Sequence, residues 1–190
     1  MAVGLGTGST VDSFLRALVS RGLKIRCVAT SPRTEELARA LGLSIEPFDR
    51  LDRLNIAVDG ADQIAPDGWL VKGRGNALTR EKIVAAAADR FVVIASSDKV
   101  VERLTPPVPL EILAFGIAAT LRALGHAKLR DAPPSPDGGV IADYLGPLTD
   151  PAAVAARLVA TPGVVEHGLF PPGLVAEILV GRGSRAERLR

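Results

Sequence analysis

The sequence has few of the residues on which several common classes of protein depend. Among its 190 residues there is one cysteine, Cys27, which excludes an internal disulfide framework and a cysteine-based metal cluster. Aromatic residues make up 4%, and 23 Lys and Arg residues against 21 Asp and Glu residues leave a net charge of only +2. The composition therefore offers neither the basic field nor the stacking surfaces typical of nucleic-acid-binding proteins, and we expect no nucleic-acid partner.

Long hydrophobic runs and targeting signals are scarce as well. The longest nearly uninterrupted apolar run, residues 112–121, is about half of the roughly 20 residues that a membrane-spanning helix needs. The first residues carry no basic flank and lead directly into Gly4, Gly6 and Gly8, which is unlike a signal peptide. We expect a cytoplasmic protein with no membrane association.

What is present is an ordinary globular composition, with 47% hydrophobic and 23% charged residues. In the first half, apolar β-like runs alternate with helix-period segments, which is typical of parallel strands joined by crossover helices. Prolines at positions 106, 107 and 109 interrupt this alternation, and a β-α-β-β-α-β order suited to a small split βαβ sandwich follows. The run at 174–180 is expected to return to the first sheet. The sequence thus predicts an α/β protein in which residues 1–105 and 173–190 form one domain and residues 106–172 a smaller α+β domain.

Element boundaries follow from the same patterns, with Ser31 expected as the N-cap of the second helix and Asn76 as the cap of the third. The expected strands are 1–5, 24–29, 55–58, 90–95, 108–113, 127–130, 139–143 and 164–168, and the expected helices are 9–20, 32–41, 77–88, 115–124 and 151–160.

A glycine-rich loop where the first strand meets the first helix predicts a phosphate site. Glycines let the backbone approach a ligand, the first amides of a helix point at it, and hydroxyl groups add donors. The loop has no Gly-Lys-Ser/Thr ending, and the second strand ends in Thr30 and Ser31 where a dinucleotide fold places an acidic residue, so NAD is disfavoured. A tight turn capped by Ser9 or Thr10 is the purely structural alternative. The residues assigned to the phosphate loop are Gly6, Thr7, Gly8, Ser9 and Thr10.

An acidic loop follows the apolar strand that ends at Val58. The carboxyl ends of parallel strands border the ligand crevice, so Asp59 and Asp62 are expected to face the same space as the phosphate loop. Desolvation and mutual repulsion would raise the pKa of at least one of them and suit it to acid-base catalysis. An Asx turn at Asp59, or a magnesium site with Asp67 as a third carboxylate, are alternatives.

A second glycine-rich loop, from Lys72 to Asn76, opens the third helix. Lys72 could neutralise a developing oxyanion while Gly73 and Gly75 allow backbone amides to reach the same atom. Glu81 shares a helix face with Leu78 and Ala85 and should therefore pack against the sheet. The alternative for Glu81 is a glutamate that only complements the helix dipole.

These motifs taken together resemble one family. The strings VGLGTGST, VDGADQI, KGRGNALTREKIV, PLEIL and TPGVVEHGLF occur in this order over nearly the whole chain and are similar to those of type A ribose-5-phosphate isomerases. The resemblance implies a Rossmann-like, mostly parallel sheet with helices on both faces, a smaller ferredoxin-like domain, and a homodimer or higher homo-oligomer formed through that domain. It implies interconversion of D-ribose 5-phosphate and D-ribulose 5-phosphate in the pentose phosphate pathway, without a metal or organic cofactor. Compared with the family, the chain looks like an N-terminally short member or a fragment.

The resemblance also implies residue roles. Glu81 would be the general base, and Asp59, Asp62 and Lys72 would lie at the reacting carbons of the sugar phosphate. The residues that would contact the substrate are Gly6, Thr7, Gly8, Ser9, Thr10, Gly60, Ala61, Gly73, Arg74, Gly75 and Lys99.

Two other functions are compatible with a phosphate loop and an acidic loop. A non-catalytic sugar-phosphate sensor would leave Glu81 and Lys72 without a role. A related sugar-phosphate enzyme, such as an amino-sugar deaminase or a CoA-transferase-like protein, is the other; a deaminase should carry a histidine near the acidic loop, and residues 59–82 contain none.

Overall fold

The computed structural model describes residues 1–51 and 53–190, which form two compact units. The first unit comprises Met1–Ala61, Arg80–Lys99 and Gly173–Arg190, and the second comprises Asp62–Thr79 and Val100–Pro172. The chain therefore passes between the units four times: inside the acidic loop after Ala61, in the first turn of a helix after Thr79, after Lys99 and after Pro172.

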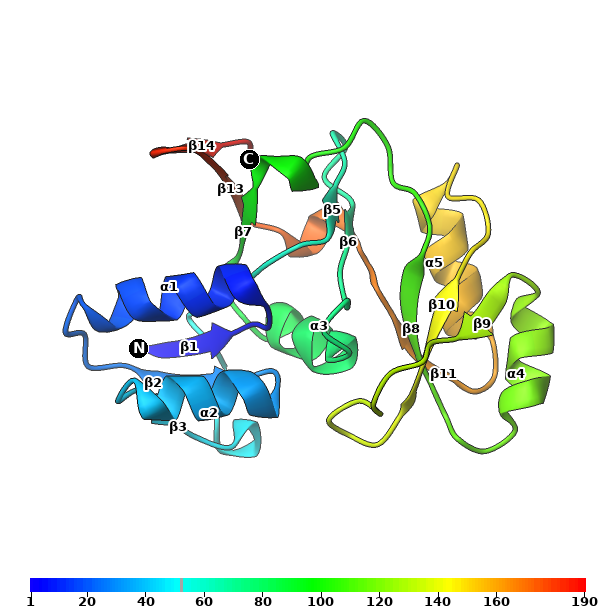
Figure 1. Ribbon diagram of the computed structural model, residues 1–190, viewed down its shortest axis with the longest axis horizontal. Helices are drawn as coiled ribbons and strands as arrows, with labels where there is room; N and C mark the ends of the chain where they lie inside the picture. Colours follow the sequence, from blue (N-terminus) through cyan, green and yellow to red (C-terminus); the bar gives the residue numbers. More distant parts are fainter. Residues whose placement is uncertain (52) are drawn as a thin grey trace. The chain divides into compact units, whose positions relative to one another are not determined.

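The first unit is built on a seven-stranded sheet in the order β14-β13-β7-β4-β1-β2-β3 (Figure 1). All neighbouring strands are parallel except the pair β13 and β14. The strands are β1 (Ala2–Leu5), β2 (Arg26–Ala29), β3 (Ser44–Ile45), β4 (Ile56–Asp59), β7 (Phe91–Ser96), β13 (Glu177–Arg182) and β14 (Arg185–Arg188). The helices are α1 (Ser9–Val19), α2 (Pro32–Ala40), α3 (Leu78–Ala86, from Arg80 onward in this unit), and the 3-10 turns η1 (Phe48–Arg50), η2 (Ser97–Lys99) and η3 (Pro172–Leu174).

Strand β1 shows why helices cover both faces of this sheet. Side chains alternate between faces along a strand, and Val3 and Leu5 lie in the apolar cluster that also contains residues of α1 and α2. On the opposite face, a Cβ at Gly4 would come within 2.4 Å of Val84 on α3. The sheet grows from β1 in both directions, so right-handed crossovers place α1 and α2 on one face and α3 on the other. This confirms the predicted mostly parallel α/β fold.

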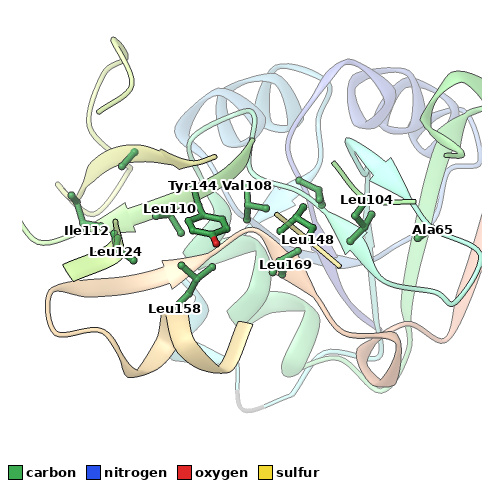
Figure 2. Packing of buried hydrophobic residues seen from close by; sticks show 12 residues of the cluster. Ala65, Leu104, Val108, Leu110, Ile112, Leu124, Tyr144, Leu148, Leu158 and Leu169 are labelled. Carbon is green, nitrogen blue, oxygen red and sulfur yellow. The ribbon is translucent and has the colours of Figure 1, made fainter. Parts of the chain in front are cut away.

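The second unit contains the predicted β-α-β-β-α-β order. Its four-stranded antiparallel sheet has the order β11-β8-β10-β9, with two helices in the connections. These elements are β8 (Val108–Ile112), α4 (Ile117–Leu124), β9 (Ala127–Leu129), β10 (Val140–Tyr144), α5 (Pro151–Ala160) and β11 (Val164–His167). Figure 2 shows the core of this unit, in which Leu110 on β8 packs with Leu124, Tyr144 and Leu158.

A small three-stranded sheet extends the second unit beyond the range expected from the sequence. Strands β5 (Gln63–Ile64), β6 (Leu70–Val71) and β12 (Leu169–Phe170) pair in the order β12-β6-β5. Ala65, Val71 and Leu104 belong to the same buried cluster as Leu110. Residues 62–79 and 100–105, which the sequence assigned to the first domain, are therefore packed with the second unit because their apolar side chains are buried there.

Two further features concern the C-terminal part of the chain. The run at 174–180 does return to the first sheet, as β13 beside β7. The basic C-terminal segment is exposed, but it forms strand β14, with Arg182 paired to Glu187 and Arg188 to Glu177. Among the described residues, no helix is long and apolar enough to span a membrane.

Candidate active site

Apart from Glu81 on α3, the predicted site residues of the first unit follow the carboxyl ends of strands at one edge of the large sheet. Loops leave the carboxyl ends of β1, β4 and β7 at Gly6, Gly60 and Ser97, and these strands are neighbours in the sheet. In parallel sheets this edge is where ligands bind.

Asp59 connects the phosphate loop to the acidic loop. Its side chain is 3% exposed, and its Oδ1 accepts hydrogen bonds from the backbone N–H of Thr7 at 3.0 Å and of Gly60 at 2.7 Å. A Cβ at Gly6 would lie 1.9 Å from the carboxylate, so only glycine allows this approach. The expectation that Asp59 shares the space of the phosphate loop is confirmed.

The phosphate loop is held from behind by hydroxyl groups that follow β2. The Thr7 hydroxyl lies 2.8 Å from Oγ1 of Thr30 and donates to Oγ of Ser31 at 2.9 Å. Thr34 donates to the carbonyl of Gly6 at 2.8 Å, and Ser31 caps α2 as predicted by accepting from the Thr34 N–H. Sequence reasoning assigned no site role to Thr30 or Thr34. Their position after the carboxyl end of a strand was the available signal.

The start of α1 presents donors at the same edge. Gly8 is the N-cap, with φ 131°, and offers no side chain to the first-turn amides. Those amides have no partner within the helix, and their dipoles favour an anion. Ser9 is exposed and Thr10 half-buried, so both hydroxyls belong to the surface of this loop.

Glu81 is buried on the sheet-facing side of α3, as the helix periodicity predicted. Its exposed fraction is 3%, and Leu78 and Ala85 on the same face are also buried. Val84, three residues further on, packs against β1 at Gly4. A glutamate that only complements the helix dipole is expected in water, whereas Glu81 is buried.

Lys99 ends η2, beyond the carboxyl end of β7. Its Nζ lies 3.0 Å from Oδ2 of Asp98, and Ser96 donates a hydrogen bond to the same carboxylate. The hydrogen bonds from Ser96 and Lys99 lower the pKa of Asp98. Lys99 is therefore paired with its sequence neighbour.

Lys72, in the second unit, is a buried lysine beside an aromatic ring. It follows β6, is 2% exposed, and its Nζ lies 5.3 Å from the centre of the Phe170 ring on β12. The backbone N–H of Lys72 donates to the carbonyl of Gly168 at 2.8 Å. The ring face attracts the ammonium group and limits its contact with water. Sequence reasoning did not identify Phe170, because the pairing of β6 with β12 joins segments about a hundred residues apart.

The loop after Lys72 forms a turn against Asp62. The N–H of Asn76 donates to the carbonyl of Gly73 at 3.1 Å, and the N–H of Arg74 donates to Oδ2 of Asp62 at 3.1 Å. Gly73 has φ 103°, and a Cβ there would come within 2.7 Å of Leu78. The prediction that Asn76 caps the helix is wrong: α3 begins at Leu78, and Asn76 adopts a left-handed φ of 62°.

Among the described residues, no three His, Cys, Asp or Glu side chains are grouped so that they could hold a metal ion. Asp67 instead uses its carboxylate to accept from the N–H of Trp69 within the β5–β6 turn.

Comparison with known proteins gives a consistent result. The family described as ribose 5-phosphate isomerase A (phosphoriboisomerase A) matches residues 26–185. The chain is 46% identical over 187 residues to ribose-5-phosphate isomerase A of Roseiflexus castenholzii, covering 90% of this chain and 80% of that protein. It is 42% identical to the Bradyrhizobium diazoefficiens protein of the same name, covering 97% of this chain and 86% of the other.

Solved structures agree with the sequence matches. Ribose 5-phosphate isomerase A from Methanocaldococcus jannaschii superposes with a TM-score of 0.93 at 31% identity, covering all of this chain and 91% of that one. A D-ribose-5-phosphate isomerase in complex with phospho-erythronic acid gives a TM-score of 0.91 at 34% identity, with 99% and 90% coverage.

Proposed function

The chain belongs to the ribose 5-phosphate isomerase A family, and from that premise we propose the residue roles by which it interconverts D-ribose 5-phosphate and D-ribulose 5-phosphate. The enzyme is thus an aldose-ketose isomerase of the pentose phosphate pathway. The reaction opens the sugar ring, removes a proton from C2 of the aldose, and returns a proton to C1 of the ketose by way of an enediolate.

The phosphate of the substrate binds at the start of α1. The first-turn amides and the hydroxyls of Ser9 and Thr10 supply donors, and Gly8 keeps the approach open. Thr30 and Ser31 hold the hydroxyl of Thr7. We assign Thr7 to binding through its place in this loop, with its backbone N–H committed to Asp59.

Glu81 is the general base that carries the proton between C2 and C1. It lies buried on the sheet-facing side of α3, and a positioned carboxylate is a group that can take a proton from carbon and return it. Lys72 and the amides of residues 73–75 stabilise the negative oxygen of the enediolate. Asp59 and Asp62 assist ring opening and move protons between hydroxyl oxygens, while Gly60, Ala61, Arg74 and Lys99 contact the substrate. None of these roles requires a metal or an organic cofactor.

The observation that carries these assignments is the Asp59 carboxylate. It accepts from Thr7 in the phosphate loop and from Gly60 in the acidic loop, so the two motifs identified separately in the sequence form one structure. A non-catalytic sensor could use the same link between the two loops to bind a sugar phosphate. A buried glutamate on α3 gives the same unit a base, which binding alone does not need.

The test is conversion of ribose 5-phosphate to ribulose 5-phosphate in a buffer that contains a chelator. We expect turnover by the parent chain, and we expect Glu81→Gln to lower kcat by about 10²- to 10⁴-fold with a smaller change in KM, because the amide cannot accept the proton. Glu36→Gln, at an exposed position on α2, is the matched control and should leave both constants unchanged. Equal kcat for Glu81→Gln and the parent would rule out Glu81 as the base.

Two broader assignments belong to the same proposal. We assign the enzyme to the cytoplasm, where phosphorylated sugars of the pathway are found, and we propose a homodimer or higher homo-oligomer with its interface on the second unit. The second unit leaves Leu113, Phe115, Val159 and Val165 exposed. Exposed apolar side chains that form one contiguous patch are typical of surfaces that bind another protein, and the proposal assigns these four residues to such a patch.

A further inference from the structure

Arg130 and Asp143 form a largely buried ion pair in the second unit, and packing of the apolar core does not require charged side chains there. Arg130 follows β9 and Asp143 lies on β10, and their side chains are only 20% and 12% exposed. The Nε of Arg130 donates to Oδ2 of Asp143 at 3.0 Å, and Nη2 donates to Oδ1. Because desolvation offsets much of the attraction within a buried pair, stability alone is a weak reason for such a pair.

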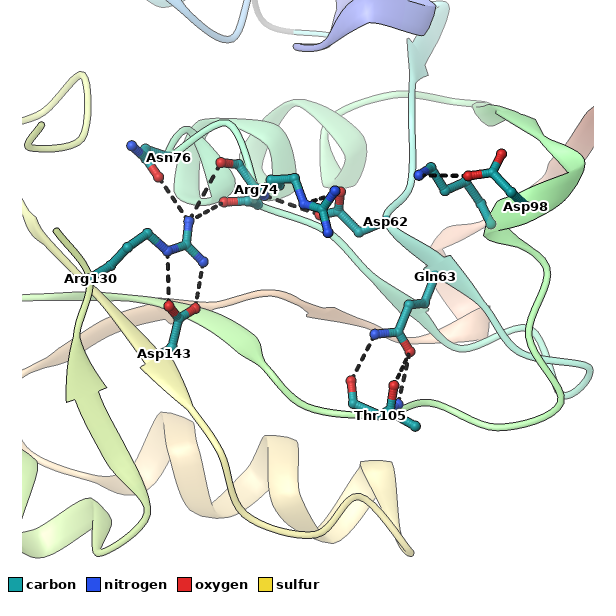
Figure 3. A network of polar contacts seen from close by, with 10 residues as sticks. Asp62, Gln63, Arg74, Asn76, Asp98, Thr105, Arg130 and Asp143 are labelled. Atoms are coloured by element: carbon teal, nitrogen blue, oxygen red, sulfur yellow. Dashed lines mark hydrogen bonds and ion pairs between the residues drawn. The ribbon is translucent and has the colours of Figure 1, made fainter. Parts of the chain in front are cut away.

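The third nitrogen of the guanidinium group faces the loop that precedes α3. Nη1 of Arg130 donates to Oδ1 of Asn76 at 2.9 Å and lies 3.4 Å and 3.5 Å from the carbonyl oxygens of Gly73 and Arg74 (Figure 3). The guanidinium fork is planar and rigid. Asp143 fixes its orientation by binding two nitrogens, and thereby directs Nη1 at three acceptors of one turn.

Asn76 has a backbone conformation that depends on support. Its φ of 62° is unfavourable for residues other than glycine, although asparagine tolerates it better than most. The bond from Arg130 engages the side chain of this residue. The turn of residues 73–76 is therefore closed by the Asn76 N–H to Gly73 carbonyl bond and held from outside by Arg130.

The same turn connects Arg130 to Asp62. In a trans peptide the C=O and N–H groups point in opposite directions. The carbonyl of Gly73 is turned toward Arg130, and the N–H of the same peptide unit, which belongs to Arg74, donates to Oδ2 of Asp62. By the same geometry, the carbonyl of Arg74 near Arg130 directs the N–H of Gly75 away from the guanidinium group.

We propose that Arg130, oriented by Asp143, is a positioning residue that sets the peptide planes of residues 73–75 through Asn76. Its role is to hold the backbone amides of the turn, and with them the Asp62 carboxylate, in the orientation that isomerisation needs. The proposal rests on the proposed function, in which that turn and Asp62 act on the substrate. Arg130 itself does not touch the reacting atoms.

The test compares Arg130→Met with a matched arginine of the same unit. Arg157 on α5 donates to the Tyr144 hydroxyl at 2.7 Å and to the Leu124 carbonyl at 3.3 Å. Within the described part of the chain, its hydrogen bonds do not involve residues 73–76. We expect Arg130→Met to lower kcat about 10- to 100-fold with little change in KM, because the phosphate loop is untouched while the turn is misplaced. Arg157→Met should keep the kcat and KM of the parent even if it lowers the melting temperature.

A double-mutant cycle separates positioning from general destabilisation. Asn76→Gly removes the acceptor but keeps the left-handed backbone accessible. If Arg130 acts through Asn76, the Asn76→Gly change should lower kcat in the parent and add less than about twofold in the Arg130→Met background, since contacting residues are not additive. Additive effects of the two changes, or an unchanged kcat in both single variants, would overturn the proposal.

Hydrogen exchange gives a readout that does not depend on activity. Amides of residues 73–76 should exchange faster in Arg130→Met and Asn76→Gly than in the parent or in Arg157→Met. A parent without isomerase activity would refute the proposed function. Hydrogen exchange would still report whether Arg130 holds the turn of residues 73–76. Unchanged exchange of the 73–76 amides in Arg130→Met would refute the proposal that Arg130 holds this turn, whatever the activity of the parent.

Discussion

At the residue scale, the burial of a side chain was predictable from the sequence, and its hydrogen-bond partner was not. Glu81 was expected on the sheet-facing side of its helix from the spacing of Leu78 and Ala85, and it is buried there. Asn76 was expected to cap the same helix and instead turns the chain two residues earlier, where Arg130 binds it. Periodicity reports which face a residue occupies, whereas the partner of a polar side chain depends on segments that are distant in sequence.

Cys27 gives a pH-dependent prediction at this scale. The thiol is fully buried on β2, and desolvation, with a smaller contribution from the nearby charge of Glu46, raises its pKa from 9.0 to about 11. The unfolded chain therefore loses the thiol proton before the folded protein does. The stabilising contribution is complete below pH 9 and is lost as the pH rises toward 11.

We expect the free energy of unfolding of the parent to fall by about 2 to 3 kcal/mol more than that of Cys27→Ala between pH 8 and pH 11, since one pKa unit corresponds to about 1.4 kcal/mol. Urea titrations at a series of pH values measure both proteins. Cys27→Ala lowers stability at every pH by removing buried volume, so only the difference in slope is informative. Parallel pH profiles would show that Cys27 titrates normally in the folded state.

At the scale of elements, the candidate site depends on strands that place their carboxyl ends side by side. The parallel order β7-β4-β1-β2 brings the loops at Lys99, Asp59, Thr7 and Thr30 to one edge. The alternation of strand and helix patterns predicts parallel strands, because such strands require crossover connections, but the order of the strands comes from the structure. Short strands such as β5, β6 and β12 carry too few residues to show a period and were not predicted.

At Gly6 the loop that follows β1 lies directly against the side chain of Asp59. A Cβ there would overlap the Asp59 carboxylate, at 1.9 Å. Gly6→Ala should therefore displace Asp59 or the loop, lowering kcat/KM at least tenfold and the free energy of unfolding by about 1 to 3 kcal/mol. Gly173→Ala is the control, because a Cβ at Gly173 meets no atom within 4 Å. Steady-state kinetics and urea unfolding of both variants measure these effects, and equal behaviour of the two variants would contradict the expected clash.

At the scale of the whole molecule, the predicted site residues are divided between the two compact units. The chain leaves the first unit after Ala61 and re-enters it at Arg80, so Asp59 and Glu81 belong to one unit and Asp62 and Lys72 to the other. Prolines 106, 107 and 109 suggested a boundary in the sequence, but the packing of Leu104 and Val71 with the second core groups earlier segments with it. Prolines mark where secondary structure is interrupted, whereas the packing of apolar side chains decides which core a segment joins.

The exposed apolar residues of the second unit give the prediction at this scale. If this unit carries the interface between subunits, replacing Phe115 and Val159 by serine should shift the molar mass in solution toward that of the monomer. Phe115 is 92% exposed, so the change should cost little stability within one chain. Ile83→Ser, at an exposed apolar position on α3, is the control and should leave the mass unchanged. Light scattering coupled to size-exclusion chromatography measures all three proteins, and a monomeric parent would refute the proposed homo-oligomer.

The sequence by itself determined the α/β architecture, the phosphate and acidic loops and the buried face of α3, because strand period, helix period and glycine spacing are local properties of the chain. Only the tertiary structure decided that Phe170 lies against Lys72, that Thr30 and Ser31 hold Thr7, and that Arg130 binds Asn76. These contacts join residues that are 23 to 98 positions apart. Such pairings depend on strand register and on competition for buried hydrogen-bond partners, which no local pattern encodes.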